Sequence, residues 1–381
     1  MYTVKTPTRA ASGPVDLTGD TVTTLEQDQT ALDELYRDFS AANLIPLWTT
    51  RSDLMPLSPR PAAVPYVWRW SELYPLAQRS GDLVPVGRGG ERRAIALANP
   101  GLPGQPYATP TLWAAIQYLG PRETAPSHHH TQTAFRFVID GEGVWTNVEG
   151  DPVAMRRGDL LLTPSWAFHE HQNTSDQPMA WIDGLDIPLV QQLDAGFFEF
   201  GPDKLGTTAT PDRSRNERLW GHPGLRPIGA ADQPSSPLMA YRWAHTDAAL
   251  TAQLELADEG HPTTLEPGHA GVRYSNPTTG GDALVTMRTE FHRLRAGVRT
   301  APRRIVGSAV WQVFDGEATV TLGEERFTVK KGDLFAVPSW CEHSIEASTQ
   351  ADLFRFSDEP VYDALGLTRL ARQAVEGREA R

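Results

Sequence analysis

The chain of 381 residues carries a formal net charge of −12 at pH 7, which excludes a nucleic-acid partner because phosphate binding requires a basic surface. Its 32 glycines and 31 prolines favour a fold rich in turns, and therefore in strands rather than helices. The one cysteine, Cys341, allows no internal disulfide, and neither an apolar leader nor a run of 18 apolar residues is present, so we expect a cytoplasmic protein without a membrane partner.

The first 93 residues read as a helix followed by an extended arm. Between 23 and 44, apolar residues recur at helical spacing, and Thr23 or Thr24 is placed to cap the helix. The following stretch is rich in proline and tryptophan. It predicts an arm over the rest of 1–93 that packs across another part of the molecule or another subunit.

From Ala94 onward, short apolar runs alternate with Gly or Pro turns at close and regular spacing. This pattern predicts the antiparallel strands of a barrel or sandwich. The expected strands lie within 112–120, 133–143, 144–151, 159–166, 169–173 and 180–189.

The second half of the chain repeats the pattern of the first. The ordered elements DGE, GDL, PSW and His occur in both halves, with the same offset from Pro164 to His169 and from Pro338 to His343. Ordered repetition predicts two matching β-barrels and an all-β-dominated fold. We place the domains at 1–93 (arm), 94–193 (first barrel), 194–280 (connection), 281–360 (second barrel) and 361–381 (helical tail).

Three histidines in the first repeat form a candidate metal site. In a strand, alternate residues share a face, so His128 and His130 point together while His129 points to the other side. His169 begins a second strand after the Gly158-Asp159 turn. If the two strands face each other across a small barrel, three imidazoles converge on one point. A solvated histidine tract is the simpler reading of the triplet alone, but the ordered set of motifs favours a metal.

The second repeat provides an internal comparison. Alignment on DGE places Arg303 at the position of His128 and Ile305 at that of His130, so only His343 is retained. One imidazole does not hold a metal tightly, even with Cys341 nearby. We therefore expect the second barrel to bind no metal.

Several blocks of the chain resemble the cupin fold and, more narrowly, the gentisate 1,2-dioxygenase family, which includes salicylate and 1-hydroxy-2-naphthoate dioxygenases. The blocks are AANLIPLWTT, AVPYVWRWSEL, ERRAIALANPGL, SHHHTQTAFRFVIDGEG, GDLLLTPSWAFHEHQN, WIDGLDIPLV and VRYSNPTTGGDALVTM. They span most of the chain. The resemblance implies a bicupin, two β-barrel or jelly-roll domains with an N-terminal helical arm, and a homotetramer.

By the same resemblance the metal is Fe(II), held by His128, His130 and His169. Imidazole alone does not select iron over copper, nickel or zinc. Many cupins add a carboxylate ligand shortly after H-x-H, whereas Gln132 to Ala134 offer none. Three neutral ligands leave the charge of the metal for an anionic ligand to balance, and an ortho-hydroxy aromatic acid would do so.

The expected pocket suits such an acid. Arg136 shares the face of His128 and His130 and would pair with a carboxylate, the alternative being a salt bridge inside the barrel. Arg92 resembles a second arginine of the family near the substrate, with Arg93 on the opposite face. For this pair a surface position is the alternative.

Further pocket residues rest on the resemblance and on strand phase. Trp113, Ala115 and Gln117 alternate along one face and resemble the family's pocket wall, although a buried tryptophan is commonly core. His171 follows His169 on the same face and would hydrogen-bond a ring hydroxyl, with Asp183 orienting it unless Asp183 caps a turn.

These features predict a ring-cleaving dioxygenase that converts gentisate and O2 to maleylpyruvate. Ala167 and Phe168 depart from the family's pattern before the third ligand and are expected at the pocket lip. Alternatives are cleavage of salicylate, a substituted salicylate or 1-hydroxy-2-naphthoate. A cupin that binds an acid or metal without catalysis, or a zinc or manganese isomerase or decarboxylase, is the alternative from another class.

Overall fold

The computed structural model describes residues 19–84, 86, 93–202, 205 and 211–371. The chain forms two compact units, Met1–Pro59 and Arg60–Arg381. The first unit contains α1 (Gly19–Ala41) and α2 (Leu47–Leu54), so the predicted N-terminal helix is confirmed with a slightly earlier start. Within it, Trp48 donates from Nε1 to the Tyr36 hydroxyl at 3.2 Å, and its ring lies 6.1 Å from that of Phe39.

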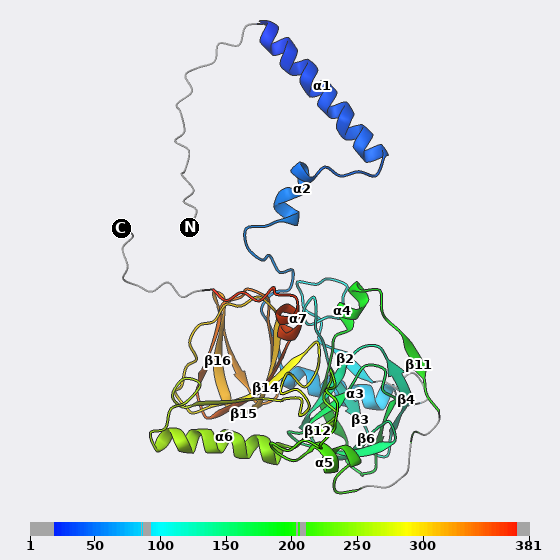
Figure 1. Ribbon diagram of the computed structural model, residues 1–381, viewed down its shortest axis with the longest axis vertical. Coiled ribbons are helices and arrows are strands. Elements are labelled where there is room, and N and C mark those ends of the chain that lie inside the picture. The colour runs from blue at the N-terminus through cyan, green and yellow to red at the C-terminus, as the bar shows by residue number, and fades with distance from the viewer. Residues whose placement is uncertain (1–18, 85, 87–92, 203–204, 206–210, 372–381) are drawn as a thin grey trace. The chain divides into compact units, whose positions relative to one another are not determined.

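The first barrel is made of two antiparallel sheets that occupy the cyan and green part of Figure 1. One sheet has the order β12-β8-β5-β10-β3-β2 and the other β11-β4-β9-β6-β7. Their strands are β2 (Ala94–Ala96), β3 (Trp113–Leu119), β4 (Thr124–His130), β5 (Ala134–Asp140), β6 (Glu142–Val148), β7 (Asp151–Arg156), β8 (Leu160–Thr163), β9 (His169–Asn173), β10 (Met179–Leu185), β11 (Phe198–Phe200) and β12 (Ala240–Tyr241).

The second barrel lies beside the first, in the yellow and orange part of Figure 1. Its larger sheet has the order β1-β18-β15-β20-β14-β13, which repeats the first barrel strand for strand, and its smaller sheet is β17-β16-β19. The strands are β1 (Tyr66–Trp68), β13 (His269–Arg273), β14 (Arg288–Leu294), β15 (Ala309–Asp315), β16 (Glu317–Leu322), β17 (Glu325–Lys330), β18 (Leu334–Val337), β19 (His343–Ala347) and β20 (Ala351–Ser357). The predicted all-β bicupin fold is confirmed.

The internal repeat extends to individual backbone contacts. His128 is the partner of His169 across β4 and β9, and Arg303 is the partner of His343 at the same place in the second barrel. Trp166 and Trp340 both have φ near +64° (64° and 63°). Their amides donate to the carbonyls of His130 and Ile305 at 2.8 Å in each case. The alignment that placed Arg303 and Ile305 opposite the ligand pair is therefore confirmed.

The predicted domain boundaries are wrong at two strands. β1 comes from the arm but pairs with β18 of the second barrel, and β12 comes from the connection but pairs with β8 of the first. Each is followed by an Arg-Trp pair and a helix, α3 (Trp70–Leu83) or α6 (Trp243–Asp258). α3 packs on β3 of the first barrel, and α6 on β13 of the second. Each strand–helix segment thus joins both barrels, which a search for strands inside one repeat does not detect.

Equivalent ion pairs fasten these segments to the GD turns. Arg69 Nη1 lies 2.8 Å from Asp333 Oδ2, and Arg242 Nη1 lies 2.6 Å from Asp159 Oδ2. The same two carboxylates accept the backbone N–H of the tryptophan that follows each arginine. Asp333 accepts from Trp70 and Asp159 from Trp243, both at 2.9 Å. The GDL repeat therefore marks a docking point for each helix.

Aromatic side chains form a core shared by the two barrels. Phe137 stacks on Phe354 with ring centroids 4.0 Å apart, and Phe135 meets Phe356 edge to face at 4.8 Å. The remaining helices are α4 (Ile187–Gln192), α5 (Arg215–Trp220) and α7 (Glu359–Ala364). The predicted helical tail is wrong for 365–371, which contain turns and an isolated bridge at Leu370, while 372–381 lie outside the described residues. None of the helices described is long and apolar enough to span a bilayer.

Candidate metal centre

A cavity of about 620 Å³ opens into the first barrel and contains most of the predicted site. The predicted residues that line it are His128, His130, His169, His171, Arg136, Asp183, Gln117 and Trp113. Its other lining residues are Ala94, Ala125, Gln132, Ala134, Leu185, Ile187, Gly196, Phe197 and Phe198.

The three histidines predicted as ligands converge as expected. One ring nitrogen of each lies within 4.8 Å of one ring nitrogen of the other two. His128 and His130 come from β4, and His169 is paired with His128 from β9. His129, on the opposite face, is directed away from them. Strand alternation and pairing across the barrel thus bring the three imidazoles together.

The backbone orients each of these rings through its Nδ1 atom. Nδ1 of His128 faces the carbonyl of Pro126 at 2.9 Å, that of His130 the carbonyl of Gln132 at 2.8 Å, and that of His169 the carbonyl of Ala167 at 2.9 Å. A carbonyl only accepts, so Nδ1 carries the proton in each ring and Nε2 presents its lone pair. This tautomer is the one that metal-binding histidines use when the second nitrogen is held by a carbonyl.

The electrostatics of the triad also fit a cation. Burial lowers the pKa of His169 well below its usual value, and the nearby Arg136 and the other two rings lower it further. A neutral imidazole is the form that binds metal. Nε2 of His169 is buried without a hydrogen-bond partner. A metal ion would satisfy this atom, so the residues present fit the group that the family implies.

Arg136 and Asp183 form a buried pair beside the triad. Arg136 Nε lies 3.6 Å from Asp183 Oδ1, too far for a hydrogen bond, and has no hydrogen-bond partner. One of its Nη atoms donates to Thr163. Burial raises the pKa of Asp183 to about 6, while Arg136 and the indole of Trp181 oppose the shift. The guanidinium is therefore incompletely satisfied and could still bind an anion.

Asp183 does not orient His171 as predicted. It lies inside β10, accepts the Trp181 Nε1–H at 2.9 Å and faces Arg136, so it neither orients His171 nor caps a turn. His171 is buried, its Nδ1 has no hydrogen-bond partner, and burial followed by the charge of Arg136 holds its pKa well below the usual value. A neutral imidazole with an unsatisfied nitrogen thus faces the cavity.

Three other predicted positions differ from expectation. Ala115 is fully buried and does not line the cavity, although its cross-strand partner Asp183 does. Phe168 is not at the lip, since it stacks on His129 with ring centroids 3.8 Å apart. Arg92 lies outside the described residues. Its neighbour Arg93 is buried and pairs with Glu123.

The cavity wall formed by β11 was missed by the sequence interpretation. Gly196, Phe197 and Phe198 line the cavity, yet they fall in the range interpreted as a connection. The alternation of Phe198, Glu199 and Phe200 is a strand signal, although three residues are too few for a confident assignment.

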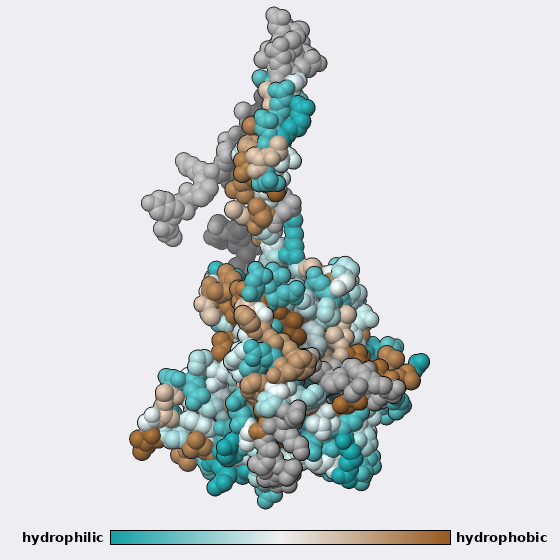
Figure 2. All heavy atoms as spheres, turned by 90° about the vertical axis from the view of Figure 1, so that its right-hand side faces the viewer, coloured by the Kyte–Doolittle hydropathy of each residue, from teal (hydrophilic) through white to brown (hydrophobic). Residues whose placement is uncertain are grey.

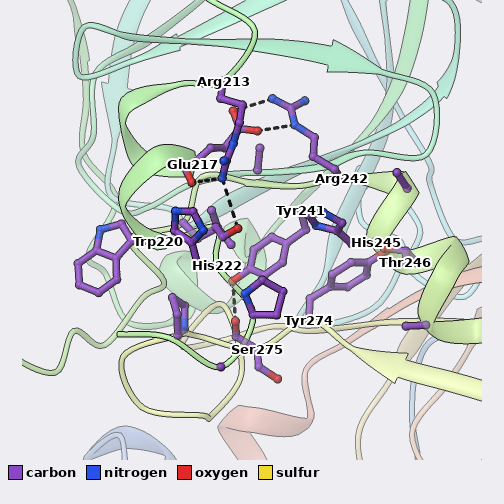
Figure 3. A pocket seen from close by; sticks show the side chains of 18 of the residues that line it. Arg213, Glu217, Trp220, His222, Tyr241, Arg242, His245, Thr246, Tyr274 and Ser275 are labelled. Carbon is purple, nitrogen blue, oxygen red and sulfur yellow. Dashed lines mark hydrogen bonds and ion pairs between the residues drawn. The ribbon is translucent and has the colours of Figure 1, made fainter. Parts of the chain in front are cut away.

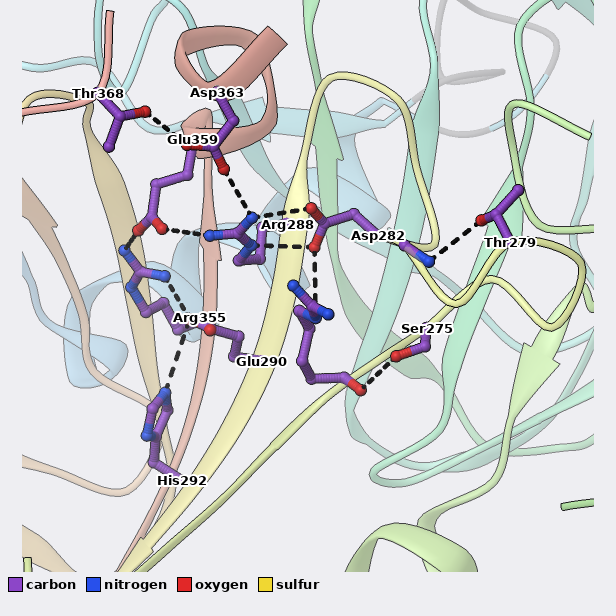
Figure 4. Close-up of polar contacts among 12 residues, drawn as sticks. Ser275, Thr279, Asp282, Arg288, Glu290, His292, Arg355, Glu359, Asp363 and Thr368 are labelled. Carbon is purple, nitrogen blue, oxygen red and sulfur yellow. Dashed lines mark hydrogen bonds and ion pairs between the residues drawn. The ribbon is translucent and has the colours of Figure 1, made fainter. Parts of the chain in front are cut away.

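The second barrel carries a network of ion pairs at positions equivalent to the cavity wall of the first. Arg355 occupies the position equivalent to Asp183, with Trp311 in place of Arg136 and Glu290 in place of Ala115. Arg355 binds Glu290 and Glu359, and Glu359 also binds Arg288 at 2.6 Å (Figure 4). Burial lowers the pKa of the one retained histidine, His343, to about 4.

A larger hollow of about 930 Å³ lies on the α5 and α6 side and holds none of the predicted site residues. Figure 3 shows Arg242 pointing across it to Glu217, with which it forms contacts of 2.6 and 2.7 Å. The hydroxyl of Tyr241 donates to Ser275 and the hydroxyl of Tyr274 meets Thr246. These polar groups are thus paired, unlike Nε2 of His169 and Nδ1 of His171 in the metal cavity.

Comparison with known proteins agrees with this geometry. The family described as Cupin domain matches residues 115–187 and 291–355. A gentisate 1,2-dioxygenase from a Streptomyces species is 75% identical over 92% of this chain and 99% of its own length. A 5-aminosalicylate 1,2-dioxygenase from a Comamonas species is 36% identical over 92% of both chains.

A crystal structure of a salicylate 1,2-dioxygenase from Pseudaminobacter salicylatoxidans is 62% identical, with a TM-score of 0.87 over 89% of this chain and 97% of that one. A variant of that enzyme in complex with gentisate has a TM-score of 0.88 at 61% identity, over 91% of this chain and 95% of that one. The fold and site thus define an enzyme of the ring-cleaving dioxygenase class built as a bicupin. The chain belongs to the gentisate 1,2-dioxygenase family.

Proposed function

We propose that this protein is an Fe(II)-dependent dioxygenase that cleaves gentisate with O2 to give maleylpyruvate. The observation that carries the proposal is the presence of three converging imidazoles and an incompletely satisfied buried guanidinium in one cavity. The first group would hold a metal and the second would bind an acid. The similarity to a gentisate 1,2-dioxygenase supports the choice of substrate.

His128, His130 and His169 would hold the iron through Nε2. Bound ferrous iron supplies the one-electron chemistry that triplet O2 requires to react with an aromatic ring. The three imidazoles are neutral and bring no charge to the metal. A substrate that contributes a carboxylate and an ionised hydroxyl balances the 2+ charge, whereas a neutral phenol does not.

Arg136 would bind and orient the substrate carboxylate. Its Nε has no hydrogen-bond partner, and its planar fork suits a carboxylate. Asp183, whose pKa is raised only to about 6, would be largely ionised at pH 7 and lies 3.6 Å from Nε of Arg136, so its charge would stabilise the guanidinium. The low exposure of both groups strengthens their interaction with a bound anion.

His171 would hydrogen-bond a ring hydroxyl or assist the reaction of oxygen. Its imidazole is neutral because burial and Arg136 depress its pKa, so it can accept a proton at one nitrogen and donate at the other. Gln117 and Trp113 complete the polar and aromatic lining on the β3 side. These groups would fix the ring so that the bond between the carboxyl-bearing and the adjacent hydroxyl-bearing carbon is presented for cleavage.

The overall reaction balances without another reductant. One C–C bond of the ring breaks, both atoms of O2 enter the product, and the four electrons that reduce O2 come from the ring. The para hydroxyl of gentisate makes the ring electron-rich and eases this oxidation. Salicylate lacks this group and is a harder substrate to oxidise.

Salicylate, substituted salicylates and 1-hydroxy-2-naphthoate form the second candidate set. The 62% identity to a salicylate 1,2-dioxygenase favours salicylate among them. Protein reconstituted with ferrous iron under argon would be given air and each acid in turn, with O2 uptake recorded and products identified by mass. We expect gentisate to give the highest kcat/KM. Faster cleavage of salicylate would reassign the substrate.

The same assay tests the two alternatives of another class, a zinc or manganese isomerase or decarboxylase and a cupin that binds an acid or metal without catalysis. Zinc-loaded and manganese-loaded protein should consume no O2, and metal analysis of protein purified under argon should find iron. Acid binding without O2 uptake in the iron-loaded protein would contradict the proposal. We further propose that the protein is a homotetramer, as the family resemblance implies, and sedimentation of the full chain tests this. We also propose that it is cytoplasmic, because its single cysteine forms no internal disulfide, and cell fractionation tests this.

A further inference from the structure

We propose that His129 and Glu199 are positioning residues that hold β11 against β4 and thereby fix Phe198 as a wall of the substrate cavity. The effect on substrate rests on the function proposed above. The effect on β11 does not, because it follows from contacts within the chain. Strand alternation directs His129 away from the metal. It would then act on the substrate cavity indirectly, by fixing β11 from the outer face of β4.

Among the described strands, β11 lies at the edge of its sheet and pairs with β4. Its residues Phe198, Glu199 and Phe200 pair with His130, His129 and His128 in that order. At one end, Thr131 Oγ1 donates to the carbonyl of Ala195 at 2.8 Å and accepts the N–H of Phe197 at 3.0 Å. At the other end, the N–H of Gly201 donates to Ser127 at 2.8 Å. The segment is short, so side-chain contacts must add to its fixation.

The ring of His129 lies between two aromatic rings on the outer side of β4. Its centroid is 3.9 Å from that of Trp166 and 3.8 Å from that of Phe168, with interplanar angles of 27° and 10°. Both aromatic residues belong to the turn that leads into the ligand His169. The ring therefore joins β4 to this turn by stacking.

The same ring also reaches β11. Nε2 of His129 lies 3.0 Å from Glu199 Oε2, and since a carboxylate only accepts, Nε2 donates. The side chain of His129 is 6% exposed and that of Glu199 is 63% exposed. A contact with one exposed partner is weak by itself. Here the stacking already fixes the donor, so less side-chain entropy is lost when Glu199 pairs with it.

The inner side of β11 carries the cavity wall. Phe198 lines the cavity, and its ring lies 5.4 Å from that of the ligand His128 at an interplanar angle of 30°. Phe197 and Phe200 are 64% and 73% exposed. Figure 2 shows apolar side chains gathered on the face of the molecule that carries β11. A shift of β11 would therefore move an aromatic wall beside the metal ligands while leaving the ligands in place.

Four variants separate these contacts. Glu199→Gln takes the negative charge from the acceptor and so weakens its hydrogen bond with His129. His129→Phe keeps the stacking but removes that hydrogen bond, and His129→Ala removes both. Glu142→Gln is the control, because Glu142 is an exposed carboxylate of the same barrel outside the β11 contacts. Measurements are amide hydrogen exchange of residues 195–201, iron bound per chain, gentisate affinity under argon, and kcat and KM in air.

We expect Glu199→Gln and His129→Phe to raise both the exchange rate of 195–201 and KM for gentisate about threefold to tenfold, with kcat within about twofold and iron unchanged. His129→Ala should raise the exchange rate and KM more than either of these two variants. The double variant His129→Phe/Glu199→Gln should equal His129→Phe, because loss of the donor already removes the one contact that the two residues form. Glu142→Gln should behave like the unmodified protein.

Unchanged exchange and unchanged KM in Glu199→Gln and His129→Ala would overturn the proposal. Loss of iron in Glu199→Gln would also overturn it, because the residue would then act on the ligands and not on the wall. If no acid is turned over even by the unmodified protein, the proposed function fails. Exchange at 195–201 still decides whether His129 and Glu199 hold β11.

Discussion

Asp186 and Asp358 occupy equivalent places at the ends of the two barrels, and each carboxylate joins one barrel to the other. Asp186 accepts the N–H of Thr133 from its own barrel at 2.9 Å and the hydroxyl of Thr286 at 2.6 Å. Asp358 accepts the N–H of Ser308 at 2.7 Å and the hydroxyl of Thr111. Through these two equivalent contacts, each barrel stabilises a loop of the other.

The pKa of Asp358 predicts a pH-dependent stability. Burial raises this pKa to about 7, with the bonds from Thr111 and Ser308 opposing the shift. In the unfolded chain the carboxyl loses its proton near pH 4. Between these values the folded state holds the extra proton, so the contribution of Asp358 to the free energy of unfolding falls as pH rises from 4 to 7.

Asp358→Asn removes this titration. The free energy of unfolding of the native protein, minus that of the variant, should therefore be larger at pH 5 than at pH 8, as measured by urea denaturation. Asp194→Asn, at an exposed position, serves as the control. A difference that is constant or increases with pH would show that burial does not hold the proton on Asp358.

A side chain at Gly158, in the GD turn that contacts the start of α6, would clash with Trp243. Gly158 has φ of +86°, and a Cβ there would lie 2.7 Å from the Trp243 ring. Gly224 has φ of +71° with nothing within 4 Å of a Cβ. Gly224→Ala should thus cost only the backbone strain of about 1–2 kcal/mol. Gly158→Ala should cost about 3 kcal/mol or more, because it also displaces the indole.

Thermal or urea unfolding of both alanine variants measures this difference. The comparison isolates the clash because the two glycines share a left-handed backbone. Equal losses of stability would mean that Trp243 moves aside freely. The Arg-Trp segment would then be a weaker attachment than its contacts indicate.

Neighbouring histidines of β4 should differ sharply in metal binding. His128→Ala removes one of three imidazoles and should lower the iron content and abolish ring cleavage, since the remaining two ligands hold the metal weakly. His129→Ala should retain one iron per chain, because its ring lies between Trp166 and Phe168 outside the triad. Metal analysis of both variants checks this, and equal loss of iron would contradict the strand phase.

Replacement of Arg136 should weaken recognition of the carboxylate. Arg136→Gln is expected to lower kcat/KM for gentisate about 100-fold, because a charge-assisted bond to the substrate is lost. Arg136→Lys should recover little of it, since an ammonium does not reproduce the planar fork. Iron content should stay unchanged, because Arg136 is not a ligand. A small effect on kcat/KM would mean that Arg136 only pairs with Asp183 and does not bind the substrate carboxylate.

The sequence was most informative where a physical period or an ordered repeat constrains position. Alternation along a strand separates His129 from His128 and His130, and the repeated PSW-to-His offset identifies His169 as their partner. Both follow from backbone geometry, which is local. The substitution of Arg303 and Ile305 in the second repeat is equally local, and the bridge from Arg303 to His343 confirms the alignment.

Features that depend on contacts across the fold were not predictable in this way. β1 and β12 pair with barrels from which they are separated in sequence, and two or three residues give no distinct period. Asp183 meets Arg136 because of the register between β10 and β5, which strand phase alone does not give. Phe198 closes the cavity from a segment that reads as a connection.

The most direct test of the central claim is a single turnover with isotopically labelled oxygen. Protein loaded with ferrous iron is mixed with gentisate under argon and exposed to ¹⁸O2, and the product is identified by mass spectrometry. We predict a ring-opened acid that carries both labelled atoms, formed by the native protein and by His129→Ala but not by His128→Ala. A product with no labelled oxygen, or ring cleavage that persists in His128→Ala, would contradict a dioxygenase reaction at the three histidines.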